Sequence, residues 1–302
     1  MTHQASLLRR AAAELIGTAA LLMVVIGSGI QAEALSRDTG VALVANSLVS
    51  AVGLGLIITL FGPLSGAHLN PVVTLTAWWA RRSGRDGLDG REALSYAGAQ
   101  IAGAIGGAVI AEAMFGRTPG TLATQVRDGG HLLVGEVVAT AGLVLVIQGL
   151  GRIGRAKLIP AAVAAYIGAA IWFTSSGSFA NPAGTVGRAF SDSFTGIAPQ
   201  SLPGFVAAQL LGGALGLGLA TLLYGREARA GVQEIAPVSL HAGSQEIAPV
   251  TVQGGPQGES KGGPQDGSQE NAREGAQDGP PADTEEPVAD IPRTGPAYEA
   301  VV

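Results

Sequence analysis

The chain has 302 residues, of which 47% are hydrophobic and only 14% are charged. Soluble domains carry about 25% charged residues, so this composition excludes an ordinary soluble protein and indicates a membrane protein. The formal net charge is −5, but residues 231–302 hold 12 of the 23 Asp and Glu and only 3 of the 18 Lys and Arg. The chain has no cysteine, which excludes disulfides, thiolate nucleophiles and cysteine-ligated metals.

Six apolar stretches are long enough to cross a bilayer, for which a helix needs about 20 residues. They form two sets of three, at 11–32, 41–61 and 92–115 and at 131–150, 158–174 and 204–224. A cleaved signal peptide is the alternative for the first stretch, but Glu14 and the absence of a clear cleavage site favour a retained span. We therefore predict six transmembrane helices.

The distribution of Lys and Arg predicts the orientation of these helices, because cytoplasmic loops are enriched in both residues. Most of the basic residues before 231 fall in segments that share a side with the N-terminus. The opposite side holds Arg37, Arg117, Arg127 and Arg188. We therefore predict a multi-pass protein of the cell membrane with both termini in the cytoplasm.

Residues 231–302 differ in character from the rest. They are rich in Gly, Pro, Gln and Glu, and the hexamer QEIAPV occurs at 233–238 and again at 245–250. Such a segment has too little apolar surface to compensate the entropy lost on ordering. We predict a membrane domain over 1–230 and a disordered acidic tail over 231–302, in which the hexamer is either a docking motif or a tolerated duplication.

The two sets of spans are related by an internal repeat, with one copy over about 9–116 and the other over about 131–226. Glu14 and Glu136 occupy matching positions in the first and fourth spans. SGAHLNPVVT at 65–74 follows the second span and SGSFANPAGT at 176–185 follows the fifth, so both copies contain S-G-x-x-x-N-P-x-x-T. Three spans in each repeat place the second copy upside down in the membrane relative to the first.

Each copy also predicts a short helix that begins at its Asn-Pro pair. Asn is a good N-cap and Pro is favoured in the first helical turn, so Asn70-Pro71 and Asn181-Pro182 mark helix starts. The segments 71–80 and 182–190 rise only about 15 Å, which is too short to span a bilayer. Inverted symmetry brings the two N-termini together near the midplane, where their partial positive charges disfavour cations.

We expect a path for water or hydroxylated solutes at this meeting point. The side-chain N–H groups of Asn70 and Asn181 are the expected donors. The expected acceptors are the backbone carbonyls of Gly66, Ala67, His68, Gly177, Ser178 and Phe179.

These two motifs resemble those of the major intrinsic protein family, the aquaporins and aquaglyceroporins, over residues 9 to about 226. The first motif is a nearly complete copy with Val72 in place of the commoner Ala, and the second, FANPA, is intact and includes Ala183. The resemblance implies an all-α membrane fold with six spans and two re-entrant half-helices, a homotetramer with one pore in each protomer, and no cofactor. It also implies that Glu14 and Glu136 brace the re-entrant loops, although intramembrane acids are alternatively proton carriers.

The sequence departs from the family where the outer pore is narrowest. Typical members have an Arg three residues after the second Asn, an aromatic residue in span two and a His or Gly in span five. Here Gly184 stands at the Arg position, Ala169 at the span-five position and Ser178 three residues before the second Asn. The position of the aromatic residue in span two is held by Ser50, or by Val52 if span two lacks one or two residues relative to the family. These small residues predict a wide, non-aromatic filter.

The sequence favours a passive channel for water and small uncharged solutes, including glycerol-like polyols and metalloid acids such as arsenite. Arg188, one turn after Gly184, either edges the vestibule or only snorkels toward the interface. The alternative function is a secondary transporter with broken helices, but beyond Glu14 and Glu136 the spans offer only Glu112 for a coupling ion. An enzyme is not expected because no nucleophile has a paired base, and neither is a nucleic-acid partner.

Overall fold

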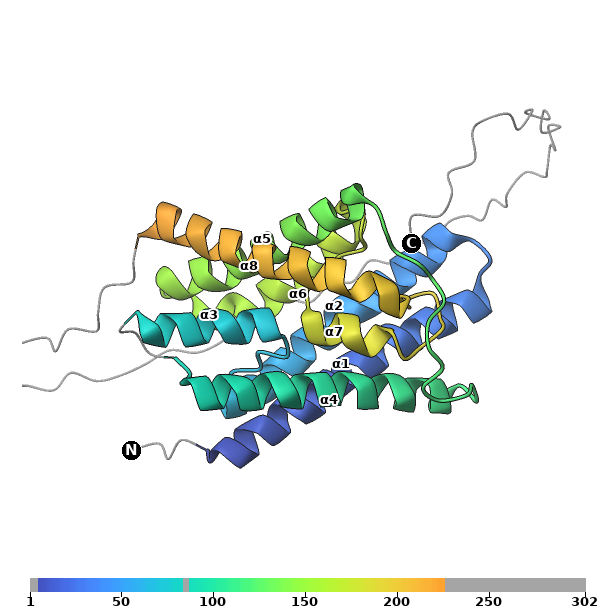
Figure 1. The fold of residues 1–302 in the computed structure, drawn as a ribbon, viewed down its shortest axis with the longest axis horizontal. Coiled ribbons are helices and arrows are strands. Elements are labelled where there is room, and N and C mark those ends of the chain that lie inside the picture. Colours follow the sequence, from blue (N-terminus) through green and yellow to red (C-terminus); the bar gives the residue numbers. More distant parts are fainter. Residues whose placement is uncertain (1–4, 84–86, 226–302) are drawn as a thin grey trace, which may run out of the picture. The chain divides into compact units, whose positions relative to one another are not determined.

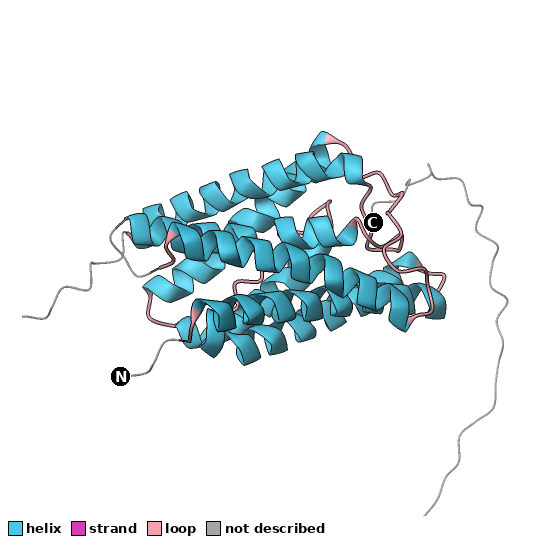
Figure 2. Ribbon diagram, turned by 60° about the horizontal axis from the view of Figure 1, so that its bottom comes forward, coloured by secondary structure: helices cyan, strands magenta, loops and turns pink. Residues whose placement is uncertain are grey.

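The transmembrane part of the chain is built from helices joined by loops (Figure 2). The computed structural model describes residues 5–83 and 87–225, and all of them belong to one unit of the chain. The predicted disordered tail, residues 231–302, lies outside the described residues.

Each repeat contributes three long helices and one short helix. The first repeat forms α1 (Leu7–Leu35), α2 (Thr39–Ser65), α3 (Pro71–Arg82) and α4 (Gly90–Met114). The second forms α5 (Gly130–Arg152), α6 (Ile159–Phe173), α7 (Pro182–Arg188) and α8 (Leu202–Tyr224). It also contains two single-turn 3-10 helices, η1 (Ala156–Leu158) before α6 and η2 (Pro199–Ser201) before α8. Six helical segments in the described residues are long and apolar enough to cross a membrane, which confirms the six-span prediction.

The first three long helices begin at polar caps outside their apolar stretches, which is why they start before the predicted spans. The Ser6 side chain accepts from the backbone N–H of Arg9 at the start of α1, and Asp38 accepts from the first N–H groups of α2. Asp89 and Glu92 form a capping box at the start of α4. Such caps satisfy backbone donors that have no partner inside the helix.

Small residues let the long helices of each repeat pack closely. Gly103 and Gly107 of α4 lie so near the backbone of Leu15 and Ala19 in α1 that an added methyl group would collide with it. The same arrangement joins α8 to α5 at Gly212, Gly216, Val137 and Ala141. These glycines therefore act within the protein, where they allow the backbones of two helices to approach.

The two short helices lie among the long ones. Figure 1 shows α3 and α7 one after the other beside α4 and α8, and both short helices contact both of these long helices. Helix α3 ends two residues after the predicted limit, at Arg82, and α7 ends two residues before it, at Arg188. Each short helix begins at the proline that the sequence indicated.

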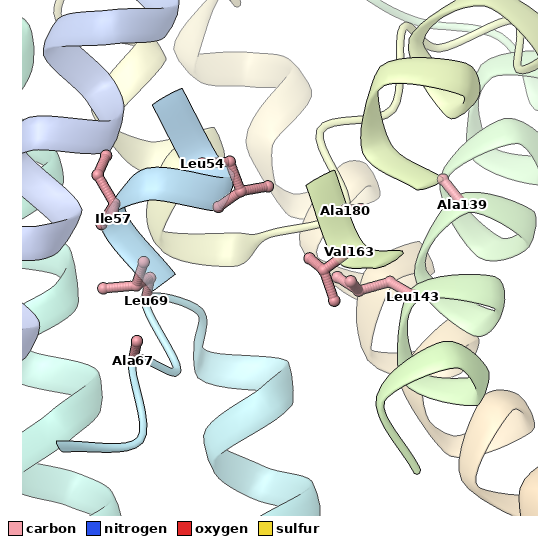
Figure 3. Packing of buried hydrophobic residues seen from close by; sticks show 8 residues of the cluster. All are labelled: Leu54, Ile57, Ala67, Leu69, Ala139, Leu143, Val163 and Ala180. Atoms are coloured by element: carbon pink, nitrogen blue, oxygen red, sulfur yellow. The ribbon is translucent and has the colours of Figure 1, made fainter. Parts of the chain in front are cut away.

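A hydrophobic cluster connects the two repeats around the loops that lead to these short helices. Figure 3 shows Leu54 and Leu69 on the first-repeat side and Leu143 and Val163 on the second-repeat side. The cluster also includes Ile57, Ala67, Ala139 and Ala180. The loop residues are thereby fixed against the long helices, and their backbones are held at the centre of the bundle.

Candidate functional site: a pore between two half-helices

The loop before each half-helix has an alternating backbone conformation. Ala67 and Leu69 have φ of 45° and 53°, and Ser178 and Ala180 have φ of 51° and 49°. Non-glycine residues rarely adopt positive φ, and each such residue costs on the order of 1–3 kcal/mol unless the surrounding structure holds it. The two loops match residue by residue, so the repeat extends to this unusual backbone.

Glu14 holds the first loop through its carboxylate. Its Oε1 accepts from the backbone N–H of His68 at 2.9 Å and from the hydroxyl of Ser65. Its Oε2 accepts from the backbone N–H of Leu69 at 2.6 Å and from Nε2 of Gln100 at 2.8 Å. The side chain of Glu14 is fully buried. Four donors therefore satisfy a charge that would otherwise be costly to bury.

Glu136 holds the second loop in the same way. Its two oxygens accept from the backbone N–H groups of Phe179 and Ala180, both at 2.8 Å, and Oε2 also accepts from Gln209 Nε2 at 2.6 Å. Gln209 in turn donates to Thr185, as Gln100 donates to Thr74 in the first repeat. The structure thus brings both carboxylates to the loops that the sequence assigned to them.

The asparagines lie where the two half-helices meet. The side-chain oxygen of Asn70 caps α3 by accepting from Val72 N, and that of Asn181 caps α7 by accepting from Ala183 N and Gly184 N. One amide N–H of each asparagine crosses to the other repeat, from Asn70 to the carbonyl of Ala180 at 2.7 Å and from Asn181 to the carbonyl of Leu69 at 2.8 Å. The sequence predicted the caps but not this exchange of hydrogen bonds. The exchange uses one amide N–H of each asparagine, and the second amide N–H remains as a donor for a solute.

A cavity of about 240 Å³ passes the asparagine pair. Its polar side chains are those of Ser50, His68, Asn70, Thr76, Gln148, Ser178, Asn181 and Arg188, and the two loops add Gly66, Ala67, Leu69, Phe179 and Ala180 to the lining, with Gly184 from α7. Its remaining lining is mainly apolar side chains of α1, α2, α5 and α6. Four motif residues do not line it, namely Pro71, Val72, Pro182 and Ala183, which are buried behind the loops.

The two candidates for the span-two filter position, Ser50 and Val52, differ in their placement. Ser50 is buried, lines the cavity, and its hydroxyl has no hydrogen-bond partner in the described residues. Val52 is 56% exposed and does not line the cavity, because it lies two residues and therefore about 200° further around the helix. Of the two alternatives in span two, the geometry favours Ser50.

The assignment of Ala169 to the filter is wrong in this structure. Ala169 is exposed and does not line the cavity, whereas Ile159, Val163, Ile167 and Ile171 of the same helix region do. Residues four apart share a helix face, and Ala169 lies on the opposite one. The four-residue spacing of these β-branched side chains was the sequence signal for the inward face. Their bulk makes this wall of the cavity apolar and narrower than the small Ala169 predicted.

Arg188 lines the cavity rather than lying away from it. Its guanidinium carbon is 3.8 Å from the centroid of the Phe179 ring, a cation–π contact. Gly184 and Ser178 line the cavity nearby, and the Ser178 hydroxyl has no partner in the described residues. The sequence did not identify Arg127, whose guanidinium lies 5.2 Å from the same ring; a lone loop arginine carried no signal of this contact.

The chain is similar in sequence to known proteins. A profile described as Major intrinsic protein matches residues 1–175. Aquaglyceroporin AqpS of Rhizobium meliloti (strain 1021) is 44% identical over 231 residues, covering 76% of this chain and 96% of that protein. The propanediol uptake facilitator PduF of Citrobacter freundii is 32% identical over 132 residues, covering 44% of this chain and 45% of the relative.

A solved structure is similar in fold. The X-ray structure of the aquaglyceroporin from Plasmodium falciparum has a TM-score of 0.53 and 21% sequence identity, and the match covers 73% of this chain and 96% of that one. At that identity the match supports the fold alone. The family profile covers more than half of this chain, and the relative at 44% identity spans three quarters of it. The chain therefore belongs to the major intrinsic protein family, whose members are passive channels and not enzymes.

Proposed function

We propose that this protein is a passive channel for water and small uncharged solutes, with glycerol-like polyols and neutral metalloid acids such as arsenite among them. The observation that carries the proposal is the cavity of about 240 Å³ at the asparagine pair, whose lining combines apolar side chains of the long helices with the polar side chains of Asn70 and Asn181. A polyol has a carbon face and a hydroxyl face, so it matches both sides of such a cavity. The names of the relatives, an aquaglyceroporin and a propanediol uptake facilitator, support solutes of this class.

The small residues of the cavity lining support the proposed wide, non-aromatic filter. Gly184 contributes no side chain, and the hydroxyls of Ser50 and Ser178 have no partner in the described residues. Unsatisfied buried polar groups are costly, so these hydroxyls favour a passing solute oxygen or water. Ile171 and Arg188 occupy the remaining wall and restrict the width on that side.

The alternative of an ion-coupled transporter has less support. Glu14 and Glu136 do not line the cavity. Their oxygens accept hydrogen bonds from the loop N–H groups. Glu112 is paired with Arg117 at 2.9 Å and accepts from the hydroxyl of Ser191. The cavity lining among the described residues therefore offers no carboxylate to a coupling cation.

We further propose that the protein lies in the cell membrane with both termini in the cytoplasm, as the Lys and Arg distribution favours. We propose a homotetramer in which each protomer has its own pore. In domain terms, residues 1–230 are the channel and residues 231–302 are a separate tail.

The filter is tested by Gly184→Arg in reconstituted proteoliposomes. The three atoms nearest to a Cβ added at this position belong to Asn181 and lie at ordinary contact distances of 3.4–3.5 Å, so the backbone accepts a side chain here. We expect glycerol uptake to fall about tenfold, equivalent to about 1.4 kcal/mol of barrier, with a much smaller loss of osmotic water permeability. Gly184→Ala is the control and keeps both fluxes. An equal loss of both fluxes contradicts a width-selective filter at this position.

A further inference from the structure

A second, smaller pocket adjoins the outer end of the main cavity. It has a volume of about 100 Å³ and shares Ile171, Phe179 and Arg188 with the main cavity. We call it the mouth pocket. Its other lining residues are Leu43, Asn46, Arg127, Trp172, Thr174, Ser176, Gly177, Phe194 and Thr195. Any molecule held in the mouth pocket therefore lies against the wall of the main cavity.

Two cationic groups and no carboxylate line the mouth pocket. Both guanidinium groups rest on one aromatic ring, since Arg188 and Arg127 lie 3.8 Å and 5.2 Å from the Phe179 centroid. The ring is itself fixed by an edge contact with Phe205 at 5.3 Å. Two like charges on one ring repel each other, so a negative charge in the pocket stabilises the arrangement.

Arg127 is the anchored member of the pair. Its Nε donates to the carbonyl of Gly196 at 2.8 Å, and its Nη2 donates to Gln125 Oε1 at 3.1 Å and to the carbonyl of Phe194 at 3.3 Å. All three acceptors are uncharged. Burial lowers the pKa of Arg127 to about 10, which still leaves the guanidinium protonated at neutral pH.

Arg188 is the member with unused donors. Its guanidinium makes no hydrogen bond and no ion pair with any of the residues 5–83 and 87–225. The cation–π contact with Phe179 is therefore the interaction that holds it among these residues. The nearby carboxylates are committed elsewhere. Glu136 accepts from the loop backbone, Glu112 pairs with Arg117, Asp192 accepts from Thr124, and Glu33 accepts from Phe194 N.

We propose that the mouth pocket binds a short-chain monocarboxylate of the size of acetate, and that the bound anion obstructs the pore. A guanidinium edge matches the two oxygens of a carboxylate in a bidentate pair. The pocket also offers Leu43, Ile171 and Phe194 to a short alkyl group, which inorganic anions lack. The obstruction rests on the proposed function, because it requires that the main cavity is the conducting path.

The experiment compares acetate with acetamide, its uncharged counterpart of nearly the same shape. Water permeability of proteoliposomes containing the full chain is measured by stopped flow in sodium acetate, in sodium chloride of equal ionic strength, and in chloride with acetamide. We expect a saturable loss of at least half of the permeability in acetate alone. Equal permeability in all three conditions, or equal inhibition by acetamide, overturns the proposal.

Variants assign the effect to the pocket. Arg188→Gln is expected to remove the acetate response, scored as the ratio of permeability in acetate to that in chloride, and Arg188→Lys is expected to weaken it because an ammonium lacks the planar fork. Arg37→Gln, at an exposed loop arginine between α1 and α2, keeps the full response. An unchanged acetate response in Arg188→Gln overturns the proposal.

Direct binding separates this inference from the proposed function. Saturation-transfer NMR on the methyl protons of acetate detects weak binding to the purified protein whether or not the pore conducts. We expect a signal with the wild type that Arg188→Gln strongly reduces. No signal with the wild type overturns the proposed site, whereas absence of water flux in chloride alone overturns the channel function.

Discussion

At the scale of single residues, the two buried carboxylates explain how the pore loops keep a strained backbone. Glu136 accepts from consecutive backbone N–H groups, those of Phe179 and Ala180, and the residues with positive φ, Ser178 and Ala180, lie on either side of Phe179. A carboxylate has acceptors on both oxygens, so it can bind two successive donors. Both oxygens of Glu136 are thus bonded to the backbone of the loop.

Glu136→Gln is expected to destabilise the protein. The amide that replaces one oxygen is a donor and faces a backbone N–H, so a buried charge-assisted hydrogen bond is lost at a cost of about 2 kcal/mol or more. We expect the unfolding temperature of the detergent-solubilised protein to fall by about 5 °C. Glu33→Gln, at an exposed carboxylate that also accepts a backbone N–H, is the control with little change. An unaltered unfolding temperature for Glu136→Gln contradicts the bracing role.

At the scale of helices, the departure from the family motif at Val72 has a counterpart elsewhere in the chain. Val72 is buried and points away from the cavity, and it fits only because α8 has a glycine opposite it. A Cβ added to Gly213 would collide with the Val72 side chain. The larger residue in α3 and the glycine in α8 therefore form a complementary pair.

Gly213→Ala is expected to lower stability by about 1–3 kcal/mol through overpacking. The double variant Val72→Ala with Gly213→Ala is expected to recover most of that loss, because the smaller side chain makes room for the added methyl group. Gly218→Ala, in the same helix but with no atom near its added Cβ, is the matched control. Thermal unfolding of the wild type, the two single variants Val72→Ala and Gly213→Ala, and the double variant gives the coupling energy, and strictly additive effects would show that the two positions do not contact.

The helix α6 shows where counting along the sequence fails. The prediction of Ala169 used a fixed distance from Asn181, but the intervening loop and the helix phase are set by packing, which a count does not contain. The spacing of Ile159, Val163, Ile167 and Ile171 indicates the inward face directly. Periodicity is a property of the helix itself, so it is the more dependable guide to the lining of a pore.

Large side chains introduced on opposite faces of α6 are expected to change glycerol permeability to different extents. Ile171→Trp inserts a large ring into the wall shared by both cavities, so glycerol permeability is expected to fall about tenfold. Ala169→Trp places the same ring on an exposed face, where it is expected to leave permeability within about twofold of wild type. Uptake assays matched for the amount of reconstituted protein check both. A large loss of glycerol permeability in Ala169→Trp would show that Ala169 does belong to the filter.

At the scale of the whole molecule, the features that the sequence predicted are those with local signals. Six spans follow from apolar length, the starts of α3 and α7 from Asn70-Pro71 and Asn181-Pro182, and the inverted repeat from matching residues. The features that it did not predict depend on contacts between distant segments. The ring contact of Arg127 with Phe179 and the exchange of hydrogen bonds between the asparagines are of this kind.

Deletion of residues 231–302 is expected to leave folding and permeability intact. The buried hydrophobic residues of the described chain run from Ala13 to Ala220, and the deleted segment has too little apolar surface to add to that core. Size-exclusion profiles and stopped-flow water permeability of the truncated and full chains provide the check. Loss of the assembled protein or a change in permeability on truncation would assign the tail a structural or gating role.

The crossed hydrogen bonds of the asparagines have a consequence for biogenesis. During synthesis the first repeat leaves the ribosome before the second, so Asn70 has no Ala180 carbonyl to bind until the second loop arrives. Irregular backbone within a bilayer needs protein or water partners, and the loop at Leu69 obtains one of them from Asn181. Both loops are therefore completed together, in the last step of assembly. A nascent chain that has inserted only its first half therefore lacks both crossed hydrogen bonds and has no finished pore.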